Sequence, residues 1–214
     1  MNAANKSRPP RSANPASRMD SREKLVRTAE RLMLRDGYSA TRVDDVIDKA
    51  GLSKGSFYHF FRSKEALGLA ALEHYYADRV GRLAVGTYAK ETDPLNRANG
   101  FLRHASHIAT DLWNTGCLLA NLAADAGGSS RVISNALKKR TSDFRALLAE
   151  LLGPFATPEI TAADLADQFL VCIEGSIVLA RIYRDPTYLQ RGLGQFRRCL
   201  GATGARGAQG MALQ

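Results

Sequence analysis

Apolar residues in this chain recur at intervals of three and four positions rather than in strict alternation. Leu25, Ala29 and Leu32 form the first such series. This period places apolar side chains on one face of an amphipathic helix. We predict that this helix runs from about Asp20, a good N-cap, to Asp36. Similar series continue to residue 200 without a convincing strand, and they predict an all-α fold.

A pair of short helices, with a glycine turn between them, is predicted to follow the first helix. Thr41 is the expected cap of the first of the pair, and Gly51 breaks it. Ser53 is the expected cap of the second, in which Phe57 and the later phenylalanines can point into a core. This arrangement is a helix-turn-helix, whose second helix enters the major groove of DNA. We place the motif at residues 42–61.

The remaining pattern predicts longer helices. Ser63 is the expected cap of a helix that continues to about Ala89, and helical hairpins are expected from residue 93 to residue 200. Thr161, with Asp164 as its capping-box partner, starts a strongly apolar helix. A helix that is apolar on more than one side must be buried on more than one side, so this helix is expected to contact several neighbours.

The composition is that of a globular protein with an excess of positive charge. The chain has 214 residues and a net charge of +9, which favours a polyanionic partner, nucleic acid ahead of an acidic membrane surface. No apolar run approaches the roughly 20 residues that cross a bilayer. Residues 1–18, rich in Ser, Pro and Asn, predict a disordered basic tail rather than a secretory signal. Cys117, Cys172 and Cys199 are widely spaced, which favours a reducing cytoplasm over a disulfide framework or a zinc site.

The residues from Thr41 to Phe61, continued by Arg62 to Leu67, resemble the DNA-binding domain of TetR-type transcriptional repressors. The resemblance implies an N-terminal three-helix helix-turn-helix domain joined to a C-terminal helical domain for ligand binding and dimerisation. It also implies a double-stranded DNA operator, a homodimer formed through helices in about 161–200, and no cofactor or metal. The predicted divisions are a tail, a DNA-binding domain, a regulatory and dimerisation domain and a flexible tail, at residues 1–18, 19–79, 80–201 and 202–214.

The predicted DNA-contacting residues combine helix starts, cations and aromatic side chains. Thr41 and Ser53 sit at helix starts, where free N–H groups and the helix dipole suit a phosphate. Arg42 and Lys54 can neutralise phosphates or reach guanine edges. Gly55 lets the recognition helix lie close to the DNA, and the resemblance adds two aromatic positions and the lysine that starts the next helix. The full set is Thr41, Arg42, Ser53, Lys54, Gly55, Ser56, Tyr58, His59 and Lys64.

One stretch of the second half is informative about an effector. Residues 115–125 resemble the Gly-Cys-Leu segment of a branch with electrophile-responsive (NemR-like) and acrylate-responsive (AcuR-like) regulators. Cys117 is expected at a helix N-terminus, where the dipole favours the thiolate and raises reactivity. The alternative is that Cys117 is a small buried apolar residue. Other candidates for an effector pocket are Trp113, Phe101, His104 and His107; two histidines without a third ligand do not predict a metal site.

These observations predict a dimeric repressor that a small molecule or an electrophile releases from a palindromic operator. A TetR-type activator, or an architectural regulator that needs no ligand, is the alternative. An enzyme would need a nucleophile, a base and a stabilising group held together, or a glycine-rich phosphate loop after a strand. Neither pattern is present, since residues 51–55 join two helices.

Overall fold

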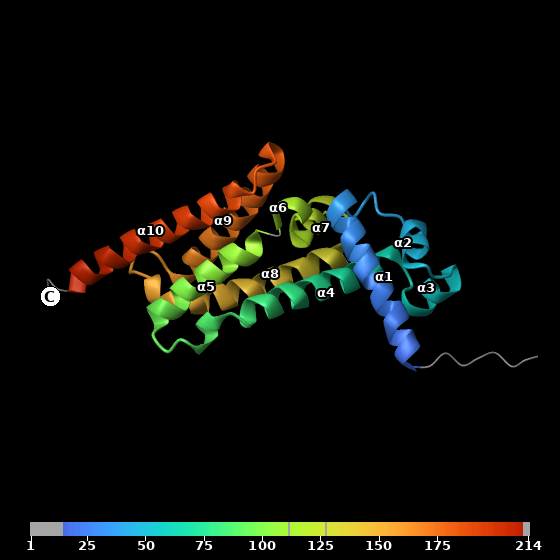
Figure 1. Ribbon diagram of the computed structural model, residues 1–214, viewed down its shortest axis with the longest axis horizontal. Helices are drawn as coiled ribbons and strands as arrows, with labels where there is room; N and C mark the ends of the chain where they lie inside the picture. Colours follow the sequence, from blue (N-terminus) through green and yellow to red (C-terminus); the bar gives the residue numbers. More distant parts are fainter. Residues whose placement is uncertain (1–14, 111, 127, 212–214) are drawn as a thin grey trace, which may run out of the picture.

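The computed structural model describes residues 15–110, 112–126 and 128–211, and within them the chain is helical without a strand, as predicted (Figure 1). Every helix in these ranges is too short or too polar to cross a membrane. In chain order the helices are α1 (Pro15–Asp36), α2 (Val43–Ala50), α3 (Lys54–Phe60), α4 (Lys64–Ala84), the 3-10 helix η1 (Thr87–Lys90), α5 (Pro94–Ala109), α6 (Leu112–Thr115), α7 (Leu118–Ala126), α8 (Arg131–Leu152), the 3-10 helix η2 (Gly153–Phe155), α9 (Ala162–Tyr183) and α10 (Thr187–Met211).

The helices α1, α2 and α3 form one end of an elongated molecule, and α9 and α10 form the other (Figure 1). α4 leaves the first end and runs beside α8 toward the middle. The predicted boundary at residue 79 therefore falls inside α4. α4 therefore connects the α1–α3 end to the rest of the molecule by one uninterrupted helix.

Two apolar cores follow this division. At the α1–α3 end, Phe57 and Phe61 are buried with residues of α1, α2 and α4, and this core also contains Leu118 and Leu122 of α7 and Ile133 of α8. The α1–α3 end is therefore packed directly against helices of the second half. The second core joins α5, α8, α9 and α10.

Predicted helix caps are confirmed at several positions, because capping depends on residues within one turn. The Ser53 hydroxyl accepts a hydrogen bond from the Ser56 amide at 3.1 Å, and Ser63 caps α4 in the same way. Thr161 and Asp164 form the predicted capping box at the start of α9.

The predicted cap at Thr41 is wrong. Arg42 is the N-cap of α2 and makes no side-chain cap. The Thr41 hydroxyl donates instead to the Gly37 carbonyl at 2.7 Å, and the Thr41 amide donates to the Tyr38 carbonyl at 3.3 Å. Both groups therefore stabilise the turn between α1 and α2, which sequence spacing alone did not reveal.

Both ends of the described chain differ from the predicted tails. α1 begins at Pro15 rather than near Asp20, and α10 continues to Met211 through a segment predicted to be flexible. Proline fits the first turn of a helix, where its missing N–H needs no partner. A helix that already exists gains a hydrogen bond for each added residue without a new nucleation step, which favours the extension of α10. The remaining parts of both predicted tails lie outside the described residues.

α4 ends at Ala84, earlier than the predicted Ala89. Tyr88 of η1 folds back so that its hydroxyl donates to the Leu83 carbonyl at 2.5 Å. Its ring packs edge-on against Phe101, with the ring centroids 5.5 Å apart. Burial of this ring against α5 offsets the helical hydrogen bonds that α4 gives up.

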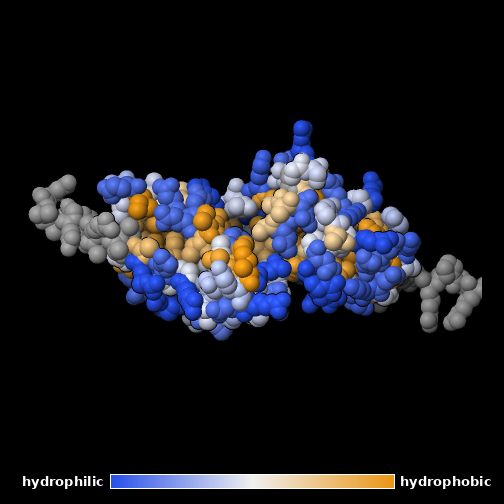
Figure 2. Space-filling view, turned by 90° about the horizontal axis from the view of Figure 1, so that it is seen from above, coloured by the Kyte–Doolittle hydropathy of each residue, from blue (hydrophilic) through white to orange (hydrophobic). Residues whose placement is uncertain are grey.

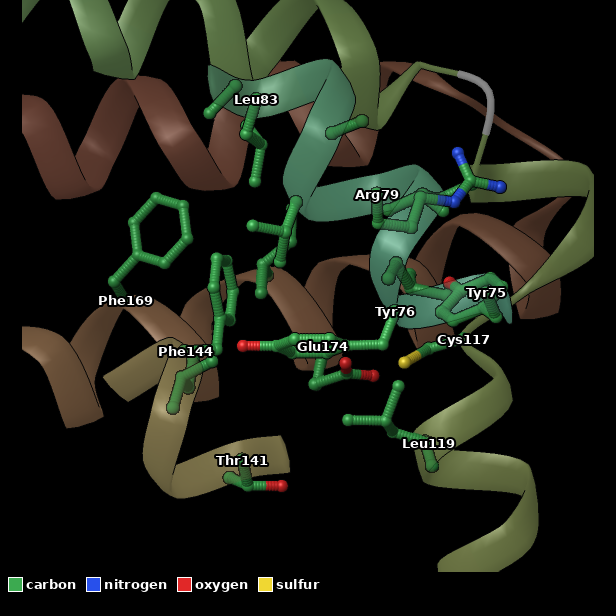
Figure 3. A pocket seen from close by; sticks show the side chains of 18 of the residues that line it. Tyr75, Tyr76, Arg79, Leu83, Cys117, Leu119, Thr141, Phe144, Phe169 and Glu174 are labelled. Carbon is green, nitrogen blue, oxygen red and sulfur yellow. The ribbon is translucent and has the colours of Figure 1, made fainter. Parts of the chain in front are cut away.

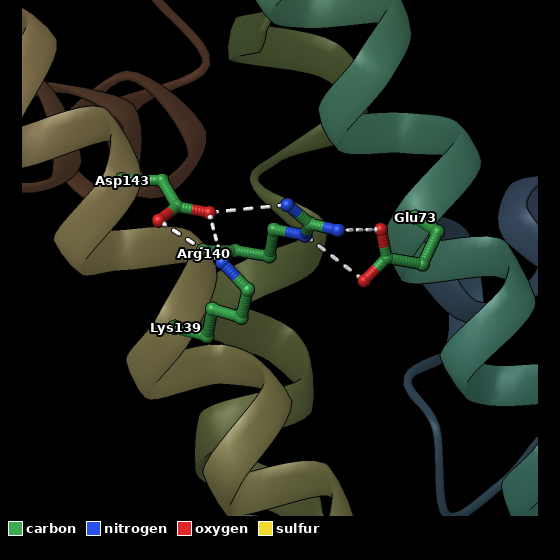
Figure 4. Close-up of polar contacts among 4 residues, drawn as sticks. All are labelled: Glu73, Lys139, Arg140 and Asp143. Atoms are coloured by element: carbon green, nitrogen blue, oxygen red, sulfur yellow. Dashed lines mark hydrogen bonds and ion pairs between the residues drawn. The ribbon is translucent and has the colours of Figure 1, made fainter.

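An ion-pair network joins α4 to α8 (Figure 4). The Arg140 guanidinium donates through Nε to Glu73 of α4 at 2.9 Å and through a second nitrogen to the other Glu73 oxygen. It also donates to Asp143 at 3.1 Å, and its carbon lies 5.0 Å from the centroid of the Tyr76 ring. A bidentate guanidinium–carboxylate pair has a fixed geometry, so these contacts hold Tyr76 in position beside the cavity described below.

Candidate DNA-binding surface and effector cavity

α3 has one buried side and one exposed side. Phe57 is fully buried, whereas Tyr58 on the next position is 63% exposed. Arg42, Lys54 and His59 are exposed at the same end of the molecule. α3 starts after the predicted glycine turn, in which Gly51 has a left-handed conformation with φ 67°. The fold therefore presents a short helix whose outer side carries cationic, aromatic and hydrogen-bonding groups.

Lys54 already has a partner on this surface. Its ammonium lies 3.0 Å from the Asp44 carboxylate of α2, with the Lys54 side chain 70% exposed. Hydrogen bonding to Asp44 raises the pKa of Lys54, so the side chain keeps its charge. Exposed pairs of this kind contribute little to stability. A phosphate can therefore replace Asp44 as the partner at small cost.

Gly55 is exposed and has space around it. A methyl group at this position would have one neighbour in the protein, the Ser53 hydroxyl at 3.7 Å, and Gly55 does not have a left-handed φ. Neither packing nor backbone conformation therefore requires glycine here. A requirement from outside the protein, such as close approach to DNA, would explain it.

Besides Lys54, four of the predicted contact residues are engaged within the protein: Thr41, Ser53, Ser56 and Lys64. Thr41 is 3% exposed, so the prediction that it offers free groups to a phosphate is wrong. The half-buried Ser56 places its hydroxyl 3.0 Å from that of Ser53. Lys64 donates to the Ser39 carbonyl at 3.0 Å, its ammonium lies 4.5 Å from the centre of the Tyr38 ring, and burial lowers its pKa. For Ser56 and Lys64 a DNA contact stays a prediction.

A cavity of about 320 Å³ lies between α4, α7, α8 and α9 (Figure 3). Aromatic and aliphatic side chains form most of its wall, which is typical of sites for small apolar ligands. Three lining residues carry chemistry beyond this: the cationic Arg79 of α4, the Cys117 thiol before α7 and the Glu174 carboxylate of α9. The wall of the cavity also includes Tyr75, Tyr76, Leu119, Ala123, Phe144 and Phe169.

Cys117 directly precedes α7, so its predicted place at a helix N-terminus is confirmed. The predicted gain in reactivity is wrong. Burial and the neighbouring Glu174 carboxylate raise the pKa of Cys117 to about 12, although the Leu119 and Ala120 amides oppose this shift. An apolar cavity disfavours the thiolate more than the helix start favours it.

Comparison with known proteins identifies the fold. Residues 25–71 match the model for bacterial regulatory proteins of the tetR family, and residues 94–193 match the C-terminal domain of LmrA/YxaF-like transcriptional regulators. The HTH-type transcriptional repressor NemR of Escherichia coli (strain K12) is 33% identical over 147 residues, which are 65% of this chain and 70% of NemR. The chain belongs to the TetR family. It is a DNA-binding transcriptional regulator.

Two further relatives of this TetR-family regulator cover most of its length. The transcriptional regulator AcuR of Cereibacter sphaeroides is 29% identical over 186 residues, which are 83% of this chain and 85% of AcuR. The crystal structure of regulatory protein TetR from Rhodobacter sphaeroides has a TM-score of 0.72 at 28% identity, and covers 83% of this chain and 97% of that chain. The predicted family, its NemR/AcuR-like branch and the all-α architecture are confirmed.

Most of the effector residues predicted for this TetR-family regulator lie outside the cavity. Phe101 is fully buried in the second core, and Trp113 packs against the same core. The His104 Nε2 atom lies 2.9 Å from the Arg82 carbonyl, and His107 is exposed. None of the four lines the cavity among the described residues. They lie on α5 and α6, which contribute Ala105, Ala109 and Leu112 to the cavity wall instead.

The sequence reasoning missed Arg79 and Glu174 of this TetR-family regulator. Glu174 gave a signal, because it is the charged residue within the largely apolar series from Phe169 to Leu179. A charge inside an apolar helix indicates a partner or a cavity. Arg79 gave no comparable signal, because arginine is common on the exposed sides of helices.

α7 connects the cavity of this TetR-family regulator to its DNA-binding end. The Asn121 side chain donates to the Met33 and Leu34 carbonyls near the end of α1, at 3.3 Å and 3.2 Å. The Asp125 carboxylate accepts from the Ser39 amide at 3.1 Å. These contacts satisfy backbone groups that the end of α1 and the following turn leave open. α7 therefore fixes the position of α1 relative to the cavity.

Proposed function

We propose that this regulator is a dimeric repressor that leaves a palindromic operator when a small molecule fills the cavity. One observation carries the proposal: α7 contributes Leu119 and Ala123 to the cavity wall and binds α1 and the following turn through Asn121 and Asp125. A ligand that displaces α7 therefore also displaces the support of the helix-turn-helix.

The exposed side of α9 supports a homodimer. Val171 is 74% exposed and Ile182 is 66% exposed, and Val178 lies between them on the same side with the open Gly175. The face of the molecule above α9 and α10 shows apolar surface between polar groups (Figure 2). Apolar residues at these intervals on an exposed helix favour association with a second helix surface. We assign this surface, within the predicted 161–200 region, to the interface between two copies of the chain.

A dimer makes operator binding sensitive to small displacements. Two recognition helices bind half-sites about 34 Å apart, one turn of DNA. A shift of α7 and α4 that changes this separation removes contacts at one half-site. Allosteric coupling in proteins is typically about 1–3 kcal/mol, which lowers affinity about 5- to 150-fold.

Operator binding tests the proposal directly. The purified protein is titrated against the DNA upstream of its own gene, and the protected bases are mapped. We expect protection of a palindrome with half-sites one turn apart, and increased transcription of the adjacent genes in a deletion strain. Decreased transcription in the deletion strain would identify an activator, and protection without symmetry would contradict the dimeric mode.

Cys117 supports a second effector class, because its thiol lines the same cavity. A neutral electrophile with an activated carbon–carbon double bond would add to the sulfur: the double bond opens as the C–S bond forms, the thiol proton ends on the neighbouring carbon, and the adduct fills the space beside α7. The raised pKa of Cys117 makes this reaction slow at neutral pH. The variant Cys117→Ser decides the question: a variant that an electrophile still releases from DNA excludes the thiol as the sensor.

A further inference from the structure

Glu174 is a carboxylate in an apolar cavity without a cationic partner. Within the described part of the chain, no Lys, Arg or His side chain forms an ion pair with it, and the Cys117 thiol is a polar neighbour that lowers the pKa of the carboxyl as a hydrogen-bonding group. In Figure 3, Glu174 lies among the lining side chains, with Phe144 and Phe169 on one side and Tyr75 and Cys117 on the other. The carboxylate therefore faces the space that a ligand would fill.

A carboxylate in this place is costly for the unliganded protein. Transfer of a charge from water into apolar surroundings is unfavourable unless a hydrogen-bonded counter-charge accompanies it. Burial accordingly raises the pKa of Glu174, and the thiol hydrogen bond opposes this only in part. A cation on a ligand would supply the missing partner, and its attraction would be strong because little water separates the two groups.

The aromatic walls favour the same type of ligand. Aromatic faces attract cations, most strongly when water is excluded. In this cavity two rings already interact with guanidinium groups: Arg79 lies 5.0 Å from the Tyr75 ring centre, and Arg140 lies 5.0 Å from that of Tyr76. The rings of Phe144 and Phe169 have no such partner among the described residues and line the cavity.

Arg79 is the lining residue that would favour an anionic ligand instead. Its Nε and Nη1 atoms are buried and have no hydrogen-bond partner among the described residues. Figure 3 shows, however, that its guanidinium points away from Glu174 toward the edge of the cavity. The cavity wall therefore carries both charges, and Glu174 is the one whose charged group lies among the apolar lining side chains.

We propose that the cavity binds an organic cation, a molecule with an apolar body and one ammonium or amidinium group that pairs with Glu174. The inference rests on the proposed effector role of the cavity and names the chemical class of that effector. A volume of about 320 Å³ suits a small body of one or two rings. The ammonium would donate to the Glu174 carboxylate, and the body would lie against Phe144 and Phe169.

Three probes with the same body test this assignment: 4-phenylbutylamine, 4-phenylbutanol and 4-phenylbutanoate. Binding of each to the full-length protein is measured by calorimetry without DNA at pH 7.5. We expect the amine to bind about ten- to hundred-fold more tightly than the alcohol, the range of a hydrogen bond to a charged group. No measurable amine binding, or an alcohol that binds equally well, would overturn the assignment.

Variants test whether Glu174 causes the preference for the amine over the alcohol. Glu174→Gln keeps the shape and removes the charge, so the advantage of the amine should disappear, whereas Glu174→Asp should retain part of it. The matched control Glu91→Gln removes a charge from an exposed residue outside the cavity and should leave the preference intact. A preference for the butanoate that Arg79→Gln abolishes would assign recognition to Arg79 and refute the role of Glu174.

The same probes separate this inference from the proposed function. DNA release is measured independently, by fluorescence anisotropy of a labelled operator fragment. An amine that binds through Glu174 without releasing DNA would support the ligand class and contradict the release mechanism. In the other outcome, a different compound releases DNA from the wild-type and Glu174→Gln proteins equally well. That result would support the release mechanism and refute the assignment of the effector to the organic cations.

Discussion

Gly55 allows a test in which stability and DNA binding should change in opposite directions. It is the second residue of α3, it is exposed, and it does not have a left-handed φ. Replacing it with alanine adds a methyl group whose nearest neighbour in the protein is the Ser53 hydroxyl, at the ordinary contact distance of 3.7 Å. The free protein therefore accepts the change without strain.

The expected changes in stability and in DNA affinity follow from the open space around Gly55 in the free protein. Alanine in a helix is favoured over glycine by about 0.5–1 kcal/mol, partly through the lower entropy of the unfolded chain. For a protein of this size that raises the melting temperature by about 1–4 °C. Against DNA the same methyl group meets a close-packed surface, and overpacking costs about 1–3 kcal/mol, which is about 5- to 150-fold in affinity.

The assay compares Gly55→Ala with Gly81→Ala. Gly81 lies in α4 with no atom within 4 Å of an added methyl group, so its variant should gain similar stability without a change in operator affinity. Melting temperature is measured by calorimetry, and affinity by anisotropy at one fixed salt concentration. A Gly55→Ala protein that is stabilised and still binds the operator within two-fold of wild type would refute the placement of Gly55 against DNA.

Three further predictions follow from contacts and burial in the structure. Asn121→Ala removes two hydrogen bonds to α1, so it should lower the free energy of unfolding by about 1–3 kcal/mol and speed amide hydrogen exchange in residues 33–41. Unchanged exchange would show that α7 does not support this turn. Burial raises the pKa of Glu174 above its value in the unfolded chain, so ionisation of this carboxyl destabilises the fold as pH rises. The gain in stability of the Glu174→Gln variant, measured by urea unfolding, should therefore increase from pH 4 to pH 8. A gain that stays constant over this range would contradict the raised pKa. The Val178→Glu variant should sediment as a monomer, whereas the control Val132→Glu, at an exposed site of α8, should stay a dimer. A Val178→Glu protein that is still a dimer would show that the interface does not include this surface of α9.

The helix-turn-helix and its caps were predictable because their causes are local. A serine accepts from an amide three residues later whatever the rest of the chain does, and Ser53 and Ser63 both do so. Thr41 failed as a cap because its hydroxyl had a nearer acceptor at Gly37, in a turn whose geometry depends on how α1 packs. Spacing identifies possible partners, and packing selects among them.

The amino-acid sequence by itself determined the helices, the buried side of α3 and the family, because these depend on period, caps and a contiguous motif. Only the tertiary structure decided which side chains share a cavity. Arg79 lies on α4, Glu174 on α9 and Cys117 just before α7, so their meeting depends on how these three helices cross. The same packing reversed the predicted shift in the pKa of Cys117, because burial near a carboxylate outweighs a helix start.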